Sequence, residues 1–254
     1  MGNRLNVVHL TDLHLFADRD DTLYGMNTEK SFCAVLENIQ KEIVDPIDFM
    51  VITGDLVHDE SDEGYAKLKQ YLSQLGIPVY LVSGNHDDPA LMTKYFADGA
   101  YGAERSLRRN NWRFIFLDTY EAGSIGGRLQ SSTLDEVDQL LKQNPEEPTA
   151  IFMHHPPVGV GSDWLDRIAL YNALEFHERT LMWPNLKLVV CGHVHQEREL
   201  EQGGVRYLTT PSTCMQFEPM QESFSLDDRL PGWRTLKFFD DGTFCSDVRR
   251  LTKT

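Results

Sequence analysis

Short apolar runs and amphipathic stretches alternate from the first residues onward. The apolar runs predict buried strands at 5–10, 49–53, 78–82, 112–118, 149–153 and 186–191. Between them, apolar residues recur at helical spacing, which predicts helices over 28–43, 61–75, 89–96, 131–143 and 172–182. Strands that alternate with helices in this order are typical of a layered α/β fold.

The last part of the chain predicts strands alone. Beyond Gly203-Gly204 the pattern predicts strands at 205–210, 233–239 and 243–248. A further hairpin is predicted at Asn110-Asn111, between 106–108 and 112–118. No internal repeat, low-complexity tract or linker divides the sequence, so we expect one domain over 1–254. Within it, 1–200 would form the core that carries the site, and the C-terminal β segment, 201–254, would complete the layers, cap the site or form a homodimer interface.

The composition restricts the partners. The 254 residues include 24 Lys and Arg against 39 Asp and Glu, a net charge of −15, and no long basic run offsets it. We therefore expect no nucleic-acid partner, because the chain would repel a phosphate backbone. No window approaches the roughly 18 apolar residues of a membrane span, and the first residues lack a signal-peptide core. The four cysteines form no CxxC pair, so we expect reduced thiols in a cytoplasmic protein without a membrane partner.

Five short motifs each follow a predicted apolar strand and contain six of the nine histidines. Loops at the carboxyl ends of strands converge in layered α/β proteins, and ligand sites collect there. The motifs are Asp12-Leu13-His14, Gly54-Asp55, Gly84-Asn85-His86-Asp87, His154-His155-Pro156-Pro157 and Gly192-His193-Val194-His195.

These residue types suit metal ions. Imidazole and carboxylate ligands together fit Mn, Fe, Co and Zn. Seven candidates are too many for one ion, but two ions that share one carboxylate would each receive four protein ligands. Two metals roughly 3.5–4 Å apart stabilise both the attacking and the leaving oxygen of a phosphoryl displacement. We expect two divalent ions, with Fe or Mn favoured and Co or Zn also compatible, held by Asp12, His14, Asp55, Asn85, His154, His193 and His195.

The order of these motifs resembles the calcineurin-like metallophosphoesterase family, whose pattern is D-x-H, G-D, G-N-H-[DE], H and G-H-x-H. The resemblance spans 11–195 and implies a four-layer α/β/β/α sandwich. It implies a first metal held by Asp12, His14, Asp55 and His195, and a second held by Asp55, Asn85, His154 and His193, with Asp55 bridging. It also gives His86 the role of contacting the phosphoryl group and protonating or stabilising the leaving oxygen.

The segments 11–16, 23–28, 210–217 and 231–234 are similar to bacterial class III cyclic-AMP phosphodiesterases. This similarity implies a cyclic-nucleotide substrate, 3′,5′-cyclic AMP, cleaved to 5′-AMP by in-line attack of a metal-activated hydroxide. Asp55 and His86 would be catalytic, and the substrate would contact His14, Asp55, Asn85, His86, His154 and His195. The segment 152–158 fits glycerophosphodiester phosphodiesterases equally well, so such an enzyme, or another phosphoesterase with the same metal site, is the alternative. A DNA nuclease is a further alternative, against which the net charge argues.

Three polar residues beside the motifs have open roles. Asp87 could cap the helix that begins near Pro89, or it could orient His86. His155 could support a ligand, contact substrate or pack at a strand end. His58 follows Asp55 by three residues, and we interpret it as a polar loop histidine because the family pattern does not use that position.

Four further residues complete the expectations. His9 and His177 are interpreted as structural. Trp164 and Phe217 follow metal-bearing motifs and could stack on an adenine ring, although aromatic side chains near loops are more often part of the local core.

Overall fold

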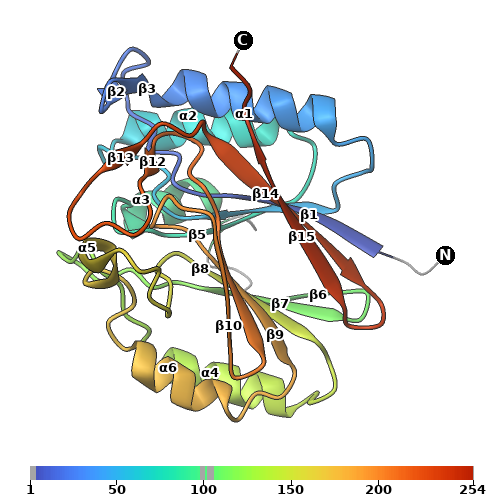
Figure 1. Cartoon of the computed structure of the whole chain (residues 1–254). Helices are drawn as coiled ribbons and strands as arrows, with labels where there is room; N and C mark the ends of the chain where they lie inside the picture. The colour runs from blue at the N-terminus through green and yellow to red at the C-terminus, as the bar shows by residue number, and fades with distance from the viewer. Residues whose placement is uncertain (1–3, 98–100, 102–105, 254) are drawn as a thin grey trace.

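The fold consists of two β-sheets packed face to face, with helices on the two outer sides (Figure 1). It is described here from a computed structural model over residues 4–97, 101 and 106–253. The layers run helix, sheet, sheet, helix, which confirms the α/β/β/α sandwich that the family resemblance implies.

The first sheet joins the N-terminal strands to the end of the chain in the order β15-β14-β1-β4-β5. β1 and β4 are parallel, as are β4 and β5, whereas β14 runs antiparallel to β1. The strands are β1 (Arg4–Leu10), β4 (Phe49–Thr53), β5 (Val79–Val82), β14 (Gly232–Phe239) and β15 (Phe244–Arg250). Its outer side carries α1 (Thr28–Glu42), α2 (Asp62–Ser73) and α3 (Pro89–Phe96).

The second sheet has the order β10-β11-β9-β8-β7-β6. Its strands are β6 (Ser106–Arg109), β7 (Trp112–Leu117), β8 (Thr149–Met153), β9 (Leu186–Cys191), β10 (Arg198–Gln202) and β11 (Val205–Thr209). β6 and β7 form the hairpin predicted at Asn110-Asn111. The outer side is covered by α4 (Ser131–Lys142) and α6 (Ala173–Thr180). β10, which is largely polar and forms an edge of the sheet, was not expected from the sequence.

Apolar side chains fill all three spaces between the four layers. The central strands therefore bury both faces, which explains why 49–53 and 149–153 are continuous apolar runs instead of alternating ones. His9 lies within this core, with its two ring nitrogens 2.7 and 2.8 Å from the hydroxyls of Thr210 and Thr53. His177 on α6 bonds the carbonyl of Pro157 at 2.7 Å. Both histidines have the structural role predicted for them.

The C-terminal β segment contributes to two places. β14 and β15 extend the first sheet beside β1, while the chain between them and β11 passes along one end of the sandwich. That stretch contains β12 (Gln216–Phe217) and β13 (Leu226–Asp227), which pair with each other. The same end carries α5 (Asp163–Asp166) and the small hairpin of β2 (Thr22–Leu23) and β3 (Met26–Asn27).

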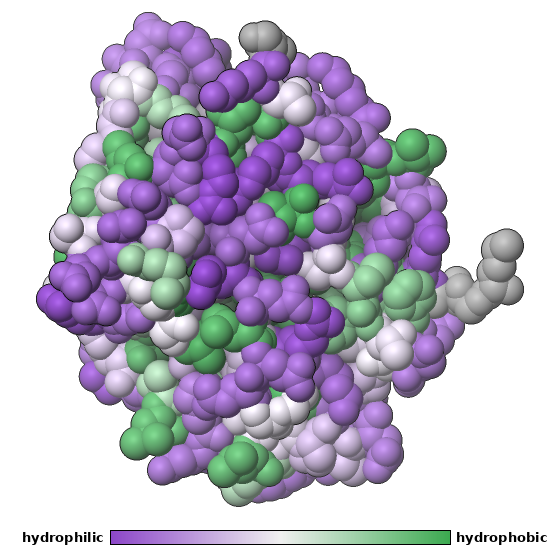
Figure 2. All heavy atoms as spheres, in the orientation of Figure 1, coloured by the Kyte–Doolittle hydropathy of each residue, from purple (hydrophilic) through white to green (hydrophobic). Residues whose placement is uncertain are grey.

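The visible surface is mainly hydrophilic. On the face shown in Figure 2, hydrophilic side chains predominate and hydrophobic ones form small separate patches. Within the described part of the chain, no helix combines the length and the apolar character that crossing a bilayer requires.

Candidate active site

The five motifs meet at one end of the sandwich. They follow β1, β4 and β5 of the first sheet and β8 and β9 of the second, and within each sheet these strands run parallel. Their carboxyl ends therefore share one edge, and hydrogen bonds join the loops there. The amide of Asp12 donates to the carbonyl of Gly54 at 3.0 Å, and that of Gly192 donates to the carbonyl of His154 at 3.1 Å.

The backbone at this edge is strained. Asp12, His14, Asp55, His193 and His195 have φ values of 55°, 48°, 50°, 69° and 48°. A side chain with a Cβ rarely adopts this left-handed region, and such residues cluster at functional sites. All five are candidate ligands, so the strained backbone coincides with the residues that the sequence selected.

Two glycines make the close packing of these loops feasible. Gly54 has a φ of 83° and lies against the backbone of Gly84 and the ring of His154. At Gly84 a Cβ would overlap with the carboxylate and the amide of Asp55. These glycines therefore allow the loops after β4 and β5 to touch at Asp55.

One group of candidate ligands is compact. Ligand atoms of Asp12, His14, Asp55 and His195 all lie within 4.8 Å of one another and are buried. His195 Nε2 is 3.3 Å from both Asp12 Oδ1 and His14 Nε2. His14 Nε2 is 3.6 Å from Asp55 Oδ2. Two nitrogens and two carboxylates in this arrangement fit one divalent ion.

The second group is identified by polar atoms that are buried without a hydrogen-bond partner among the described residues. These atoms are Asn85 Oδ1, His154 Nε2 and His193 Nε2. An unsatisfied buried polar atom is costly, and three of them in one expected ligand set fit a bound cation. Asp55 Oδ1 lies 3.4 Å from His154 Nε2, whereas its Oδ2 faces His14. The two oxygens of Asp55 thus face different histidines, one from each expected metal set, which is compatible with a bridging carboxylate.

Hydrogen bonds also fix the ring orientation of two candidate ligands. His154 Nδ1 donates to the carbonyl of Thr53 at 2.7 Å, and His195 Nδ1 donates to that of Met215 at 2.9 Å. A neutral imidazole that donates from Nδ1 keeps the lone pair of Nε2 free for a metal. In both residues Nε2 is the atom that faces the candidate ligand group.

Burial determines the charge of the site. Desolvation lowers the pKa of His14 and of His193 well below the usual value, so both rings are neutral. Burial alone would raise the pKa of Asp55, but nearby His154 holds it well below the usual range. Burial alone would lower the pKa of His154, but the Asp55 carboxylate raises it to about 9, so without a metal the ring binds a proton at Nε2, the position that a metal ion would take when His154 serves as a neutral ligand. A negative carboxylate that attracts positive charge therefore lies at the centre of the site.

His86 lies at the cavity beside the candidate ligands. Its amide donates to Asp55 Oδ1 at 2.9 Å, and its ring is half-buried between those of His14 and His58. His58 stacks on His86 with centroids 4.6 Å apart, and its Nδ1 lies 3.0 Å from His14 Nδ1. His58 lies in the loop after β4, as interpreted from the sequence, and the fold in addition brings its ring against His14 and His86.

Neither role expected for Asp87 is observed. The cap of α3 is Asp88, whose carboxylate accepts from the amides of Ala90 and Leu91. The Asp87 carboxylate is buried and accepts from four other donors: the amides of Leu56, Val57 and Gly84 and the hydroxyl of Tyr65. It therefore joins the loop of Asp55 to the loop of Asn85 and His86, instead of orienting the His86 ring.

His155 packs against two candidate ligands and is held by hydrogen bonds to a neighbouring loop. Its Nε2 donates to the carbonyl of Ile125 at 3.0 Å, and Nδ1 is 2.8 Å from the Thr119 hydroxyl. Its ring packs on those of His154 and His193. Burial lowers the pKa of His155 to about 3, so the ring is neutral.

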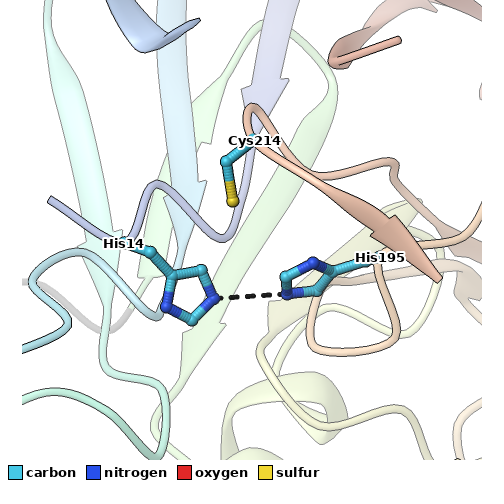
Figure 3. A group of neighbouring side chains, drawn as sticks. All are labelled: His14, His195 and Cys214. Atoms are coloured by element: carbon cyan, nitrogen blue, oxygen red, sulfur yellow. Dashed lines mark hydrogen bonds between the residues drawn. The ribbon is translucent and has the colours of Figure 1, made fainter. Parts of the chain in front are cut away.

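One cysteine near the site had no signal in the sequence. Cys214 Sγ lies within 4.8 Å of ligand atoms of His14 and His195, and Figure 3 shows the thiol pointing toward these two rings. Burial raises the pKa of Cys214 to about 12, so the group stays a thiol, and it contacts the carbonyl of Asp12 at 3.4 Å.

A cavity of about 230 Å³ adjoins the candidate ligands. The candidate ligands and His86 make its inner side polar, while Trp164, Phe217 and neighbouring apolar side chains line the rest. Both aromatic residues expected near a base are thus at the cavity. Phe217 is only 9% exposed and stacks on His195 at 4.3 Å, so one of its faces is already covered.

The sequence has close relatives among known proteins. It matches the family model of calcineurin-like phosphoesterases over residues 5–197. It is 38% identical over 247 residues to a 3′,5′-cyclic-nucleotide phosphodiesterase of Nostoc sp., covering 97% of this chain and 92% of that protein. Identity to the 3′,5′-cyclic adenosine monophosphate phosphodiesterase CpdA of Escherichia coli K12 is 37% over 252 residues, covering 99% and 91%.

Solved structures with the same fold have far lower sequence identity. A dimetal phosphatase from Danio rerio superposes with a TM-score of 0.67 at 16% identity, covering 95% of this chain and 98% of that one. A purple acid phosphatase from yellow lupin gives 0.66 at 14% identity, covering 98% and 52%. At these identities the similarity shows the fold alone.

Proposed function

Because the chain belongs to the calcineurin-like phosphoesterase family, we propose that it is a metal-dependent phosphodiesterase that converts 3′,5′-cyclic AMP to 5′-AMP. The family is hydrolytic and uses two divalent metals. The observation that carries the chemistry is Asp55, whose two oxygens face His14 and His154, one histidine of each proposed metal set. The substrate is proposed from the names of the Nostoc and Escherichia coli relatives, which align with nearly the whole chain.

We assign the metals to the sets that the sequence suggested. Asp12, His14, Asp55 and His195 would hold one ion, because their ligand atoms are mutually close. Asp55, Asn85, His154 and His193 would hold the other, because three of these side chains have unsatisfied buried atoms. The mixed nitrogen and oxygen donors suit Fe or Mn, and Co or Zn also fit.

Two divalent ions, when bound, supply positive charge that stabilises both the attacking and the leaving oxygen of an in-line displacement at phosphorus. The chain's own residues supply position and protons. Asn85 and His86 lie side by side at the cavity, where the amide and the imidazole can donate to phosphoryl oxygens. His86 is held at Asp55 through its amide, and we assign its ring to protonate the departing 3′ oxygen.

We propose a cytoplasmic protein with a small-molecule substrate. All four cysteines are free, which fits a reducing compartment. The second candidate is a glycerophosphodiester phosphodiesterase, because the same metal groups would serve any phosphodiester and the segment 152–158 fits both classes.

Product analysis tests the proposal. The purified protein is stripped of metal, reloaded with Mn or Fe, and incubated separately with 3′,5′-cyclic AMP and with glycerophosphocholine. Metal-dependent formation of 5′-AMP, with little turnover of the other diester, is expected. Cleavage of glycerophosphocholine alone would replace the proposed substrate by the second candidate.

Variants test the residue roles in the same assay. Asp55→Ala and His86→Ala should each lose most of the turnover while the fold remains intact. His177→Gln is the matched control, because His177 is a structural histidine outside the candidate site. Near-normal rates in metal-loaded Asp55→Ala and His86→Ala would contradict the assignment.

A further inference from the structure

Four aromatic side chains form a connected wall at the mouth of the cavity. Tyr24 lies between β2 and β3, Trp164 on α5, Phe217 on β12, and Phe224 between β12 and β13. Successive ring centroids are 5.1 Å apart for Tyr24 and Phe224, 5.4 Å for Phe224 and Trp164, and 5.0 Å for Trp164 and Phe217. Phe217 in turn stacks on His195. This aromatic wall therefore extends from a candidate ligand to the surface.

The outer rings of the aromatic wall are exposed. Tyr24 is 60% and Phe224 44% exposed, although both border the cavity. Exposed apolar side chains that gather at a cavity are typical of a binding surface. These exposed rings play no part in the proposed metal chemistry, because the candidate ligands line the inner side of the cavity.

The backbone at Tyr24 supports a role for its side chain. Tyr24 and Gly25 are the two central residues of the β2–β3 hairpin, and both have positive φ, 49° and 82°. Such turns favour Asn, Asp or Gly at the first position, and a bulky residue there is strained. This strained position places an aromatic ring beside Phe224, and backbone strain of this kind clusters at functional sites.

The cavity thus has two chemically different halves. The inner half presents Asp55, Asn85, His86 and the imidazoles of the candidate ligands. The outer half presents the aromatic wall with Leu23 and Ile168. A matching ligand carries an anionic phosphodiester at one end and a flat apolar ring at the other. A small polar alcohol would leave the wall uncovered.

We propose that the aromatic wall binds the nucleobase of a cyclic nucleotide by stacking, and that Trp164 and Phe224 are its main contacts. The inference rests on the proposed function and names the residues that select its substrate. Phe217 supports the wall from inside, because its ring is buried against His195. This assigns the base contact to Trp164 and Phe224 instead of Trp164 and Phe217.

The aromatic wall should favour ligands that carry a base over base-free ligands, but it should discriminate only weakly between adenine and guanine. Phe217 and Phe224 have no polar side-chain atoms, and Trp164 Nε1 is buried without a hydrogen-bond partner among the described residues. Within the wall, the Tyr24 hydroxyl and Trp164 Nε1 are therefore the groups that could bond a base edge, and an N–H donor fits acceptor atoms that adenine and guanine both carry. Stacking tolerates every base because each has a π-face. We therefore expect cyclic GMP to be used within about threefold of cyclic AMP, since only missing hydrogen-bond partners produce strong rejection.

The test compares KM for 3′,5′-cyclic AMP with KM for ribose 3′,5′-cyclic phosphate that lacks a base. The metal-loaded wild type is compared with Trp164→Leu and Phe224→Leu, which keep apolar volume but remove the ring. Each variant should raise KM for cyclic AMP about tenfold, the size expected for the loss of one base–aromatic stack. KM for the base-free diester and kcat for both should stay near the wild-type values, which also shows that the variants fold.

Phe244→Leu is the matched control. Phe244 is a half-buried aromatic at the start of β15, paired with Phe238 at the end of the sheet away from the site. It should leave both KM values unchanged. Wild-type KM ratios in Trp164→Leu and Phe224→Leu, with cyclic AMP still turned over, would overturn the wall assignment alone. A wild type that does not cleave cyclic AMP would overturn the proposed function, and the inference with it.

Discussion

Asp87→Asn is the most informative substitution outside the candidate ligands. The Asp87 carboxylate is 1% exposed and accepts four hydrogen bonds. Oδ1 receives the amides of Leu56 and Val57 at 3.0 and 3.2 Å and the hydroxyl of Tyr65 at 2.9 Å, and Oδ2 receives the amide of Gly84 at 2.9 Å. Asparagine has the same shape but only one acceptor oxygen, so at least one N–H must face another N–H.

The expected loss of stability follows from the missing acceptor oxygen. In the better orientation the amide oxygen keeps the three donors at Oδ1, and the side-chain NH₂ faces the amide of Gly84. One charge-assisted bond is lost and a buried donor is left without a partner, which together cost about 2–4 kcal/mol. Leu56 follows Asp55 directly, and Gly84 precedes Asn85 directly. The same change should therefore loosen both metal groups and lower metal affinity.

Denaturation and metal titration measure the two effects. Urea unfolding of the metal-free protein gives the free-energy difference, and calorimetric titration with Mn gives the affinity and stoichiometry. Burial raises the pKa of Asp87 to about 7, so both experiments are run near pH 8, where the wild-type carboxylate is ionised.

Asp88→Asn is the control for this experiment. Asp88 is the neighbouring acid, and it caps α3 by accepting from the amides of Ala90 and Leu91. Asparagine is an equally good cap, so this variant should stay within about 0.5 kcal/mol of wild type. The reasoning is refuted if Asp87→Asn is as stable as Asp88→Asn and binds two Mn ions with wild-type affinity.

Three further predictions concern backbone, pH and metal. Gly84→Ala places a Cβ against the Asp55 carboxylate, so metal content should fall and turnover should drop about 100-fold, while unchanged circular dichroism reports the fold. Burial, with a smaller contribution from Arg234, lowers the pKa of His9 well below 6.5. Below about pH 6.5 the unfolded chain gains this proton and the folded chain does not, so the free energy of unfolding decreases as pH falls. In urea titrations near pH 6 and 5, the free energy of unfolding of His9→Gln should decrease by about 1.4 kcal/mol less per pH unit than that of the wild type. Removing metal that was present at a hundred times its Kd should cost about 2.7 kcal/mol, or roughly 5–10 °C in Tm by calorimetry, for each of the two proposed sites, and an unchanged Tm would contradict the metal assignment.

The sequence predicted the parts of the fold whose pattern repeats. The long helices have several buried positions at helical spacing, the central strands are continuous apolar runs, and both elements form at the positions predicted from the sequence. β10 was missed because Arg198–Gln202 is an edge strand with mostly polar side chains. β2, β3, β12 and β13 have two residues each, which is too short for any periodicity.

The same distinction holds for the candidate site. Asp12, Asp55 and His193 could be selected because each belongs to a motif at a strand end, where parallel strands must converge. The contact of His58 with His86, and the thiol beside His14, arise between loops that are distant in sequence. Asp87 was misassigned because its motif gives its position but not the direction of its carboxylate, which points back toward Leu56 and Gly84.

Chemistry and substrate choice depend on different parts of this chain. All the candidate metal ligands fall within 5–197, the stretch that matches the family, and their strained backbone is held between two packed sheets. Phe224 lies beyond that stretch, and Tyr24 lies in a two-residue turn, so both can change without disturbing the layers. Among the described residues, the ring contact between the aromatic wall and a candidate ligand is that of Phe217 with His195, so substitutions at the outer rings should alter which diester binds while the hydrolytic step stays the same. In this protein, the proposed base contacts can therefore change while the candidate metal groups stay the same.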